Sequence, residues 1–287
     1  MKNILNIVKE ILRDIFNNEI DIDKPNLSEA TIRFIIRNYD KAISEKLENF
    51  FSEQEKLIKY SLKKTFNLFN QKGAYDISPA LLKYRIVDLK PVFRKELEKA
   101  MNNCFNLCKT QNITFLNKVK DNLLNYCSNT QLKRTQASFL ENVLPSVSYN
   151  SEKWQKMIIR DQQKKMVGNM SYITAINNNA IGFIWKNRKD KKVVGNPAGL
   201  YPKGNEIHNN HWKRDGKLYL FKDSQALEKG FIKKTNNIDY AEDIKDGIPG
   251  MAINCRCTMR VIYRLYEIPK EYDFILTEKG LEQKLSS

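Results

Sequence analysis

The side chains best suited to bind a metal ion are two histidines and a closely spaced pair of cysteines. His208 and His211 are the only histidines of the chain and lie three residues apart in "IHNNHWKRDGKLY". Cys255 and Cys257 follow a Pro-Gly turn in "DGIPGMAINCRCTMR". Two imidazole nitrogens and two thiolate sulfurs form the donor set of a closed tetrahedral zinc site. One interpretation is therefore that these four residues hold a structural zinc ion.

Two other interpretations of the cysteine pair stay open. If the chain continues as a strand, both cysteines share one face with the apolar residues Met259, Val261, Tyr263 and Leu265, because strand side chains alternate. Both thiols would then pack in the core, with a basic ladder of Arg256, Arg260 and Arg264 on the other face. The third interpretation is a reactive thiol, but no local signature identifies a base or an oxyanion site.

Other catalytic patterns are weak. A metal-dependent nuclease could recruit His208, His211 and Asp215, yet no acidic cluster of the kind that binds paired magnesium ions is apparent in the sequence. The stretch "GNPAGLYPKG" lacks the pattern of a phosphate-binding glycine loop. We therefore expect that the protein is not an enzyme, with a metal-dependent nuclease or a toxin-like effector as the alternative.

The first half of the chain must be helical. From Ser28, apolar residues recur at three-or-four spacing as far as Phe69, and "QKGAYDISP" interrupts the pattern. Helical spacing resumes through "LLKYRIVDLKPVFRKELEKAMNNCFNLCKTQ" and "ITFLNKVKDNLLNYC". Cys104 and Cys108 lie four residues apart in this region, on one helix face, which favours buried thiols.

The second half has a different texture. Short alternating runs suggest strands in "AIGFIW", "GKLYLF" and "TMRVIYRLYEIP", with glycines and prolines between them. The predicted fold class is therefore α+β. We expect an elongated helical N-terminal region over residues 1–148, followed over residues 149–287 by a compact α+β module with short antiparallel strands.

Composition limits the environment of the protein. Five cysteines in 287 residues favour reduced thiols in a cytosol-like compartment. The N-terminal stretch "MKNILNIVKEILRDIF" is typical of an amphipathic helix and not of a signal peptide. The longest uncharged window, residues 166–185, contains four asparagines, so we expect no membrane-spanning segment.

The net charge of +16 is concentrated in the middle of the chain. Residues 51–200 carry 26 Lys and Arg against 11 Asp and Glu, whereas the segments on either side are close to neutral. Such a basic stretch suits an anionic partner, such as nucleic acid or an acidic protein surface. Solvated helix faces in a lysine-rich composition are the alternative.

The order of motifs in the C-terminal part resembles a known family. Trp185, a polar run with Asp190, "HNNHWKRDG" and "DGIPGMAINCRC" before a strand are similar to the head morphogenesis domain of tailed bacteriophages, the Mu F-like minor head proteins. The resemblance covers roughly residues 150–265. Many members carry an additional upstream Cys-x-x-Cys, whereas this chain has no cysteine between residues 127 and 255.

The resemblance implies a minor structural protein of the virion that works with the portal and other head proteins in head assembly, and in DNA packaging or ejection. It implies a location in the capsid interior near the portal, after assembly in the host cytoplasm, and no membrane partner. Metal binding has been suggested for the Cys/His set of the family, which maps here to His208, His211, Cys255 and Cys257.

The basic stretch would then lie beside packed phage DNA. Contacts between basic side chains and phosphates need no base recognition, and "WKNRKDKKVV" offers Lys186, Arg188, Lys189, Lys191 and Lys192 for them. Trp185 is either a stacking platform for bases or a core residue on one strand face with Ile181 and Phe183. A nonspecific DNA-binding protein unrelated to virions is a further alternative.

Overall fold

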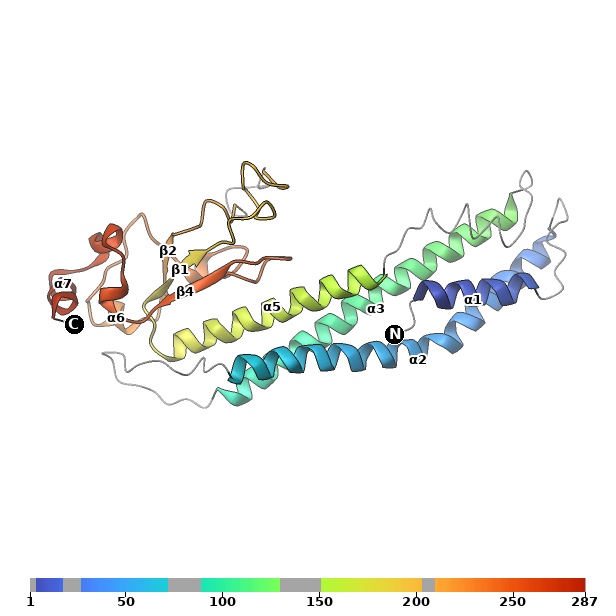
Figure 1. Cartoon of the computed structure of the whole chain (residues 1–287), viewed down its shortest axis with the longest axis horizontal. Helices are drawn as coiled ribbons and strands as arrows, with labels where there is room; N and C mark the ends of the chain where they lie inside the picture. The colour runs from blue at the N-terminus through green and yellow to red at the C-terminus, as the bar shows by residue number, and fades with distance from the viewer. Residues whose placement is uncertain (1–3, 18–26, 72–88, 130–150, 203–209, 287) are drawn as a thin grey trace. The chain divides into compact units, whose positions relative to one another are not determined.

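A computed structural model describes residues 4–17, 27–71, 89–129, 151–202 and 210–286 (Figure 1). The long helices are α1 (Ile4–Asn17), α2 (Glu29–Gln71), α3 (Lys90–Ser128) and α5 (Ser151–Asn177), and the short ones are α6 (Gln225–Glu228) and α7 (Glu278–Leu285). The strands are β1 (Gly182–Lys186), β2 (Leu218–Leu220), β3 (Asp239–Tyr240) and β4 (Thr258–Ile262). The predicted α+β class is confirmed.

The chain divides into two compact units. The first comprises Met1–Ser61 with Met101–Ile159, and the second comprises Leu62–Ala100 with Arg160–Ser287. The predicted boundary between residues 148 and 149 lies outside the described residues and stays a prediction.

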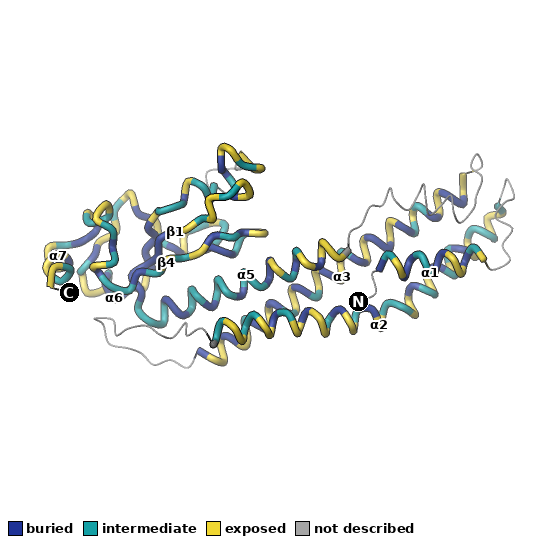
Figure 2. Tube along the Cα trace, viewed as in Figure 1, coloured by how far each residue is buried: buried dark blue, intermediate teal, exposed yellow. Residues whose placement is uncertain are grey.

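The first unit is built from helices. Its core contains the apolar faces of α1, α2 and α3, and α1 runs alongside α2 (Figure 1). Tyr39 of α2 is buried in this core and donates a hydrogen bond to the carbonyl oxygen of Leu116, at 3.1 Å. Cys104 and Cys108 of α3 are both buried, as their spacing predicted. Along α3, buried and exposed residues alternate at helical spacing (Figure 2).

Local sequence explains where α2 begins. The hydroxyl of Ser28 accepts a hydrogen bond from the backbone N–H of Thr31, at 3.1 Å, and so satisfies one of the free donors of the first turn. The helix then continues through the whole apolar pattern to Gln71. The apolar pattern from Ser28 to Phe69 predicts one long helix or two in tandem, and the structure has one continuous helix.

The second unit contains a four-stranded sheet in the order β3-β2-β1-β4. β1 pairs antiparallel with both β2 and β4, whereas β2 and β3 are parallel. The expectation of antiparallel strands is thus met by the central pairs, and the parallel pairing makes the sheet mixed. Gly182 fits here because a Cβ atom at this position would lie 2.1 Å from the carbonyl oxygen of Tyr219 on β2.

Both faces of the sheet are covered, which places β1 in the centre of the unit. One face packs against α5 in a cluster that contains Phe183, Trp185, Cys255 and Cys257. The other face packs against α6 and the C-terminal turns in a cluster that contains Ile184, Ile262 and Leu265. All of β1 except Lys186 is buried in consequence.

The prediction that one strand runs from the cysteines to residue 269 is only partly correct. β4 begins at Thr258, so Cys255 and Cys257 lie in the preceding loop. Leu265 does not share their face, because the chain leaves the sheet after Ile262 and carries Leu265 into a 3₁₀ turn that packs on the other side. Met259 and Val261 do pack on the cysteine side.

Among the described helices, none combines the length and the apolar character needed to cross a membrane. The uncharged window of residues 166–185 is divided between the end of α5 and β1.

Candidate metal centre

Three of the four predicted metal ligands lie together. The ligand atoms of His211, Cys255 and Cys257 are within 4.8 Å of one another, and all three residues are buried. This group is the only one of its kind among the residues that the structure describes. His208 lies outside the described residues. The protein therefore has a three-residue group that could hold a metal ion.

The two cysteines are positioned by the loop between β3 and β4. The loop turns at Gly250, with φ of +96°, and at Asn254, with φ of +55°. The Asn254 conformation is held from α5, because the Asp161 carboxylate accepts a hydrogen bond from the Asn254 backbone N–H at 2.6 Å. The N–H groups of Gly250 and Cys257 both point at the Cys255 sulfur, at 3.4 Å each. Two backbone N–H donors of the loop therefore converge on the Cys255 sulfur.

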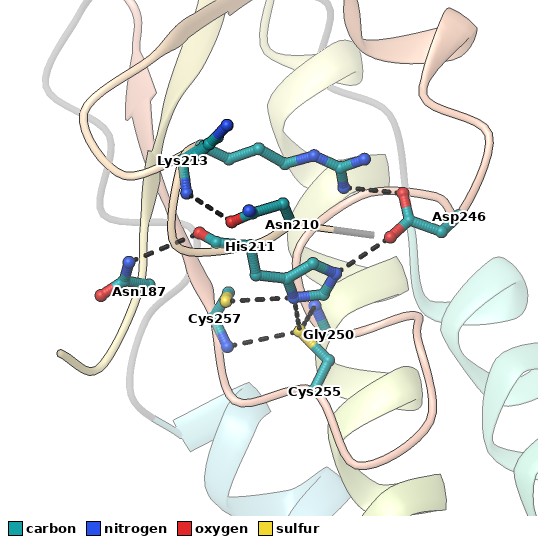
Figure 3. A network of polar contacts seen from close by, with 9 residues as sticks. Asn187, Asn210, His211, Lys213, Asp246, Gly250, Cys255 and Cys257 are labelled. Carbon is teal, nitrogen blue, oxygen red and sulfur yellow. Dashed lines mark hydrogen bonds and ion pairs between the residues drawn. The ribbon is translucent and has the colours of Figure 1, made fainter. Parts of the chain in front are cut away.

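His211 comes from a turn that lies before β2. Asn187, just after β1, donates from its amide nitrogen to the His211 carbonyl oxygen at 3.4 Å. Asn210 accepts a hydrogen bond from the Lys213 N–H at 2.9 Å, which closes the turn. Both contacts fix the backbone and so aim the imidazole at the cysteine loop (Figure 3).

The imidazole of His211 bridges sulfur and carboxylate. Its Nδ1 atom lies 3.4 Å from the Cys255 sulfur and 3.5 Å from the Cys257 sulfur (Figure 3). Its Nε2 atom lies 2.9 Å from the carboxylate of Asp246. An Nε2–H that donates to Asp246 leaves the lone pair of neutral Nδ1 directed at the two sulfurs, which is how a carboxylate orients a metal-binding histidine.

The two spacings between the His211 nitrogen and the cysteine sulfurs fit a tetrahedral ion. With zinc–sulfur and zinc–nitrogen bonds of about 2.3 and 2.1 Å, tetrahedral directions place sulfur and nitrogen about 3.6 Å apart. The two observed separations of 3.4 and 3.5 Å lie close to that value. These two nitrogen–sulfur separations therefore fit such a group.

Asp246 and Arg214 form a charged support behind the histidine. Arg214 donates to the second oxygen of Asp246 at 2.6 Å, and its guanidinium lies 4.9 Å from the centre of the Trp185 ring. The same Trp185 ring meets the His211 ring edge-on, with 5.1 Å between centroids. Trp185 is fully buried, so it anchors the site in the core and is not available to stack on bases.

The electrostatics of the site favour negative charge on the Cys255 sulfur. The Cys257 thiol and the His211 ring lower the pKa of Cys255 against the effect of burial, whereas the neighbouring Cys255 sulfur and burial raise the pKa of Cys257. Burial by itself would lower the pKa of His211, but hydrogen bonds to Asp246 and Cys255 raise it to about 9. A cation held between these groups would replace the protons that the sulfurs and the imidazole otherwise share.

Comparisons of the chain with protein-family models, curated proteins and solved structures found no match.

Two supporting residues were missed from the sequence. Neither Asp246 nor Arg214 was predicted to belong to the site, although Asp246 opens the "DGIPG" turn and Arg214 follows His211 by three residues. Asp215, the acidic ligand considered for a nuclease, lies elsewhere: it accepts the Asn187 N–H at 2.8 Å and lies 3.6 Å from Lys189. A carboxylate directly before a turn that leads to two cysteines was the available signal.

The predicted DNA-contacting residues lie at the end of β1 and in the loop that follows. Five basic side chains are exposed there: Lys186, Arg188, Lys189, Lys191 and Lys192. Asp190, in the middle of this segment, forms an ion pair with Arg256. The segment is therefore exposed to solvent and tied to the loop that carries the cysteines.

Proposed function

We propose that this chain is a structural minor head protein of a tailed phage, whose C-terminal module is stabilised by a zinc ion at His211, Cys255 and Cys257. One observation supports the proposal most strongly. The separate parts of the motif order that resembles the head morphogenesis domain, namely Trp185, His211, Gly250 and the cysteine pair, contact one another at one buried site. Because these residues lie together in the structure, they support the resemblance more strongly than their order along the chain does.

Zinc is the metal that these donors favour. Thiolate and imidazole ligands in tetrahedral arrangement suit zinc better than magnesium or calcium, which prefer oxygen. The three residues are buried and come from two loops, one before β2 and one before β4. These two strands are not neighbours in the sheet. An ion at this point would therefore link the turn before β2 to the loop before β4, which is a structural role.

The fourth ligand proposed from the sequence is His208. If it binds the ion, His208→Ala weakens zinc binding, whereas a site completed by water retains its affinity in that variant. Either result is compatible with the His211, Cys255 and Cys257 group, so the measurement identifies the fourth ligand alone.

A test of the head-protein proposal is the composition of purified virions. Mass spectrometry of virions of the phage that encodes the chain should detect it at a few copies, together with the portal, and the chain should copurify with the portal from infected cells. Its absence from virions in which portal peptides are found would refute the proposal. That result would leave the zinc site untouched.

Thiol chemistry is the second candidate function, and one observation favours it. Cys255, His211 and Asp246 form a chain of contacts at 3.4 and 2.9 Å, which is the order of nucleophile, base and orienting acid. A nuclease with paired magnesium ions has less support, because the described residues contain no cluster of carboxylates.

Alkylation separates these two functions. A zinc-bound Cys255 should react slowly with iodoacetamide until a chelator removes the ion, whereas a catalytic thiolate should react rapidly without chelator. Peptide mapping identifies which cysteine is modified. Cys127, which is buried in the helical unit, serves as the internal reference for a thiol that a chelator does not expose.

Asp246→Asn should weaken zinc binding by about 10- to 100-fold, because the variant removes the carboxylate charge behind the His211 imidazole. Competition with a chromogenic chelator measures the affinity. Asp243→Asn is the matched control, since Asp243 is exposed and pairs only with Lys222 among the described residues, at 2.5 Å. Equal affinities of the two variants would contradict the role of Asp246.

A further inference from the structure

A pocket lined partly by the loop that carries Cys255 and Cys257 has four basic side chains and no carboxylate in its lining. It has a volume of about 570 Å³ and belongs wholly to the second unit. Arg160 and Lys164 enter it from α5, Arg188 from the loop after β1, and Arg256 from between the two cysteines. Four cations from three separate segments therefore converge on one cavity.

Carboxylates of the described residues leave most of these cations unpaired. Arg256 forms an ion pair with Asp190. Arg160, Lys164 and Arg188 have no carboxylate within ion-pair distance in the part of the chain that the structure describes. Asp161, the acidic residue of α5 beside them, is engaged by Lys165 at 2.8 Å and by the Asn254 N–H.

The four cations are close enough to influence one another. Burial and the charges of Arg256, Arg188 and Arg160 lower the pKa of Lys164, and the nearby Cys255 sulfur only partly opposes this effect. Holding like charges together costs free energy in the empty protein, and a bound anion would relieve the repulsion. The arrangement is therefore suited to an anionic ligand.

We propose that this pocket binds a phosphate group of a nucleic-acid backbone. The proposal rests on the nucleic-acid partner of the proposed head protein. Three guanidinium groups offer forked pairs of N–H donors that match phosphate oxygens, and Lys164 adds a compact charge. The hydroxyl groups of Ser171 and Thr258, which also line the pocket, can donate to the same oxygens.

An extended polyanion fits the surroundings better than a single free phosphate. Arg188 belongs both to the pocket and to the exposed basic segment of residues 186–192. A backbone with one phosphate in the pocket would continue past Arg188 towards this basic segment. The pocket would thus fix the position of a nucleic-acid strand, which the basic segment of residues 186–192 alone would hold only loosely.

The test compares two double variants that each lose two positive charges. Arg160→Gln with Lys164→Gln removes half of the pocket charge, and Lys229→Gln with Lys233→Gln removes two exposed lysines near α6. Anisotropy of a labelled duplex of mixed sequence gives Kd for the full zinc-loaded chain between about 50 and 200 mM salt. Circular dichroism verifies that each variant is folded.

The pocket variant should raise Kd at least about tenfold and reduce the salt dependence by about two phosphate contacts. The control should change Kd by no more than about twofold. Equal losses in both variants would overturn the proposal, since binding would then follow net charge alone. Arg188→Gln, a loop variant, should weaken binding in the same direction and provides the answer if the α5 variant does not fold.

Two competitors distinguish the source of the anion. The first is pyrophosphate or a nucleoside triphosphate. If it binds the unsubstituted chain and binds the pocket variant more weakly, while the duplex binds neither, the ligand is a free nucleotide and the proposal is overturned. Poly-glutamate that displaces the duplex as well as unlabelled DNA does would also overturn it. None of these outcomes bears on whether the chain is present in virions, so the two proposals fail separately.

Discussion

Cys255→Ala is expected to lower the stability of the second unit by at least about 3 kcal/mol, together with the loss of bound zinc. The substitution removes the sulfur on which the Gly250 and Cys257 N–H groups converge, and with it one of the three buried residues of the proposed zinc site. For a unit of this size, the loss corresponds to a fall in Tm on the order of 10 °C. Thermal unfolding with parallel measurement of zinc content tests both effects.

Cys127→Ala is the matched control for this substitution. Cys127 is as buried as Cys255 but lies in the core of the helical unit, with apolar neighbours. We expect it to cost about 1 kcal/mol and to leave the zinc content unchanged. If chelation lowers Tm equally in Cys255→Ala and in the unsubstituted chain, the cysteine does not contribute to a metal site.

Trp185→Ala is expected to destabilise the second unit by about 3–5 kcal/mol, the usual cost of removing a buried aromatic side chain. Trp185 is fully buried on the central strand and contacts the rings of Phe183 and Tyr219. The same substitution removes the surface against which the His211 ring and the Arg214 guanidinium pack. Zinc affinity should therefore fall together with stability.

Trp154→Ala provides the comparison, because Trp154 of α5 is 43% exposed. It should cost no more than about 1 kcal/mol and leave zinc binding unchanged. Trp185→Phe, which retains an aromatic ring in the core, should lie between the two. Stabilities from chemical denaturation rank the variants, and an unchanged stability in Trp185→Ala would contradict a core role.

The helices of the first half were predictable because their signals are local, whereas α5 was not predicted. The stripe from Ser28 to Phe69 repeats at the spacing of a helix, and the Ser28 hydroxyl caps the first turn. The central strands were predictable for a similar reason, since "AIGFIW" and "GKLYLF" are short apolar runs between turn residues. The parallel pair of β2 and β3 was not, because strand order depends on contacts that are distant in sequence.

The site could be predicted only as far as its residue types. Concentration of the histidines and the Cys-x-Cys spacing singled out His211, Cys255 and Cys257. The cysteines lie in a loop and not on a strand, and this loop turns at Asn254, which has a positive φ. Asp161 of α5, 93 positions away in the sequence, stabilises the Asn254 conformation. Sequence spacing carries no signal of such a contact.

The basic pocket shows the same limit. The sequence has an excess of Lys and Arg over residues 51–200, and within it only the dense basic segment of residues 186–192 could be recognised as a candidate binding site. Arg160 and Lys164 share an α5 face at helical spacing, but only the folded chain brings them to Arg188 and Arg256. Charge totals therefore predict the class of partner and not the place where it binds.

The metal content of the purified full-length chain tests the central claim most directly. Elemental analysis after gel filtration in metal-free buffer should find about one zinc per chain, reduced to background in Cys255→Ala and unchanged in Cys127→Ala. Zinc below about a tenth of an equivalent, after expression with zinc supplied, would contradict the account. The buried histidine and cysteines would then be a hydrogen-bonded core without a metal.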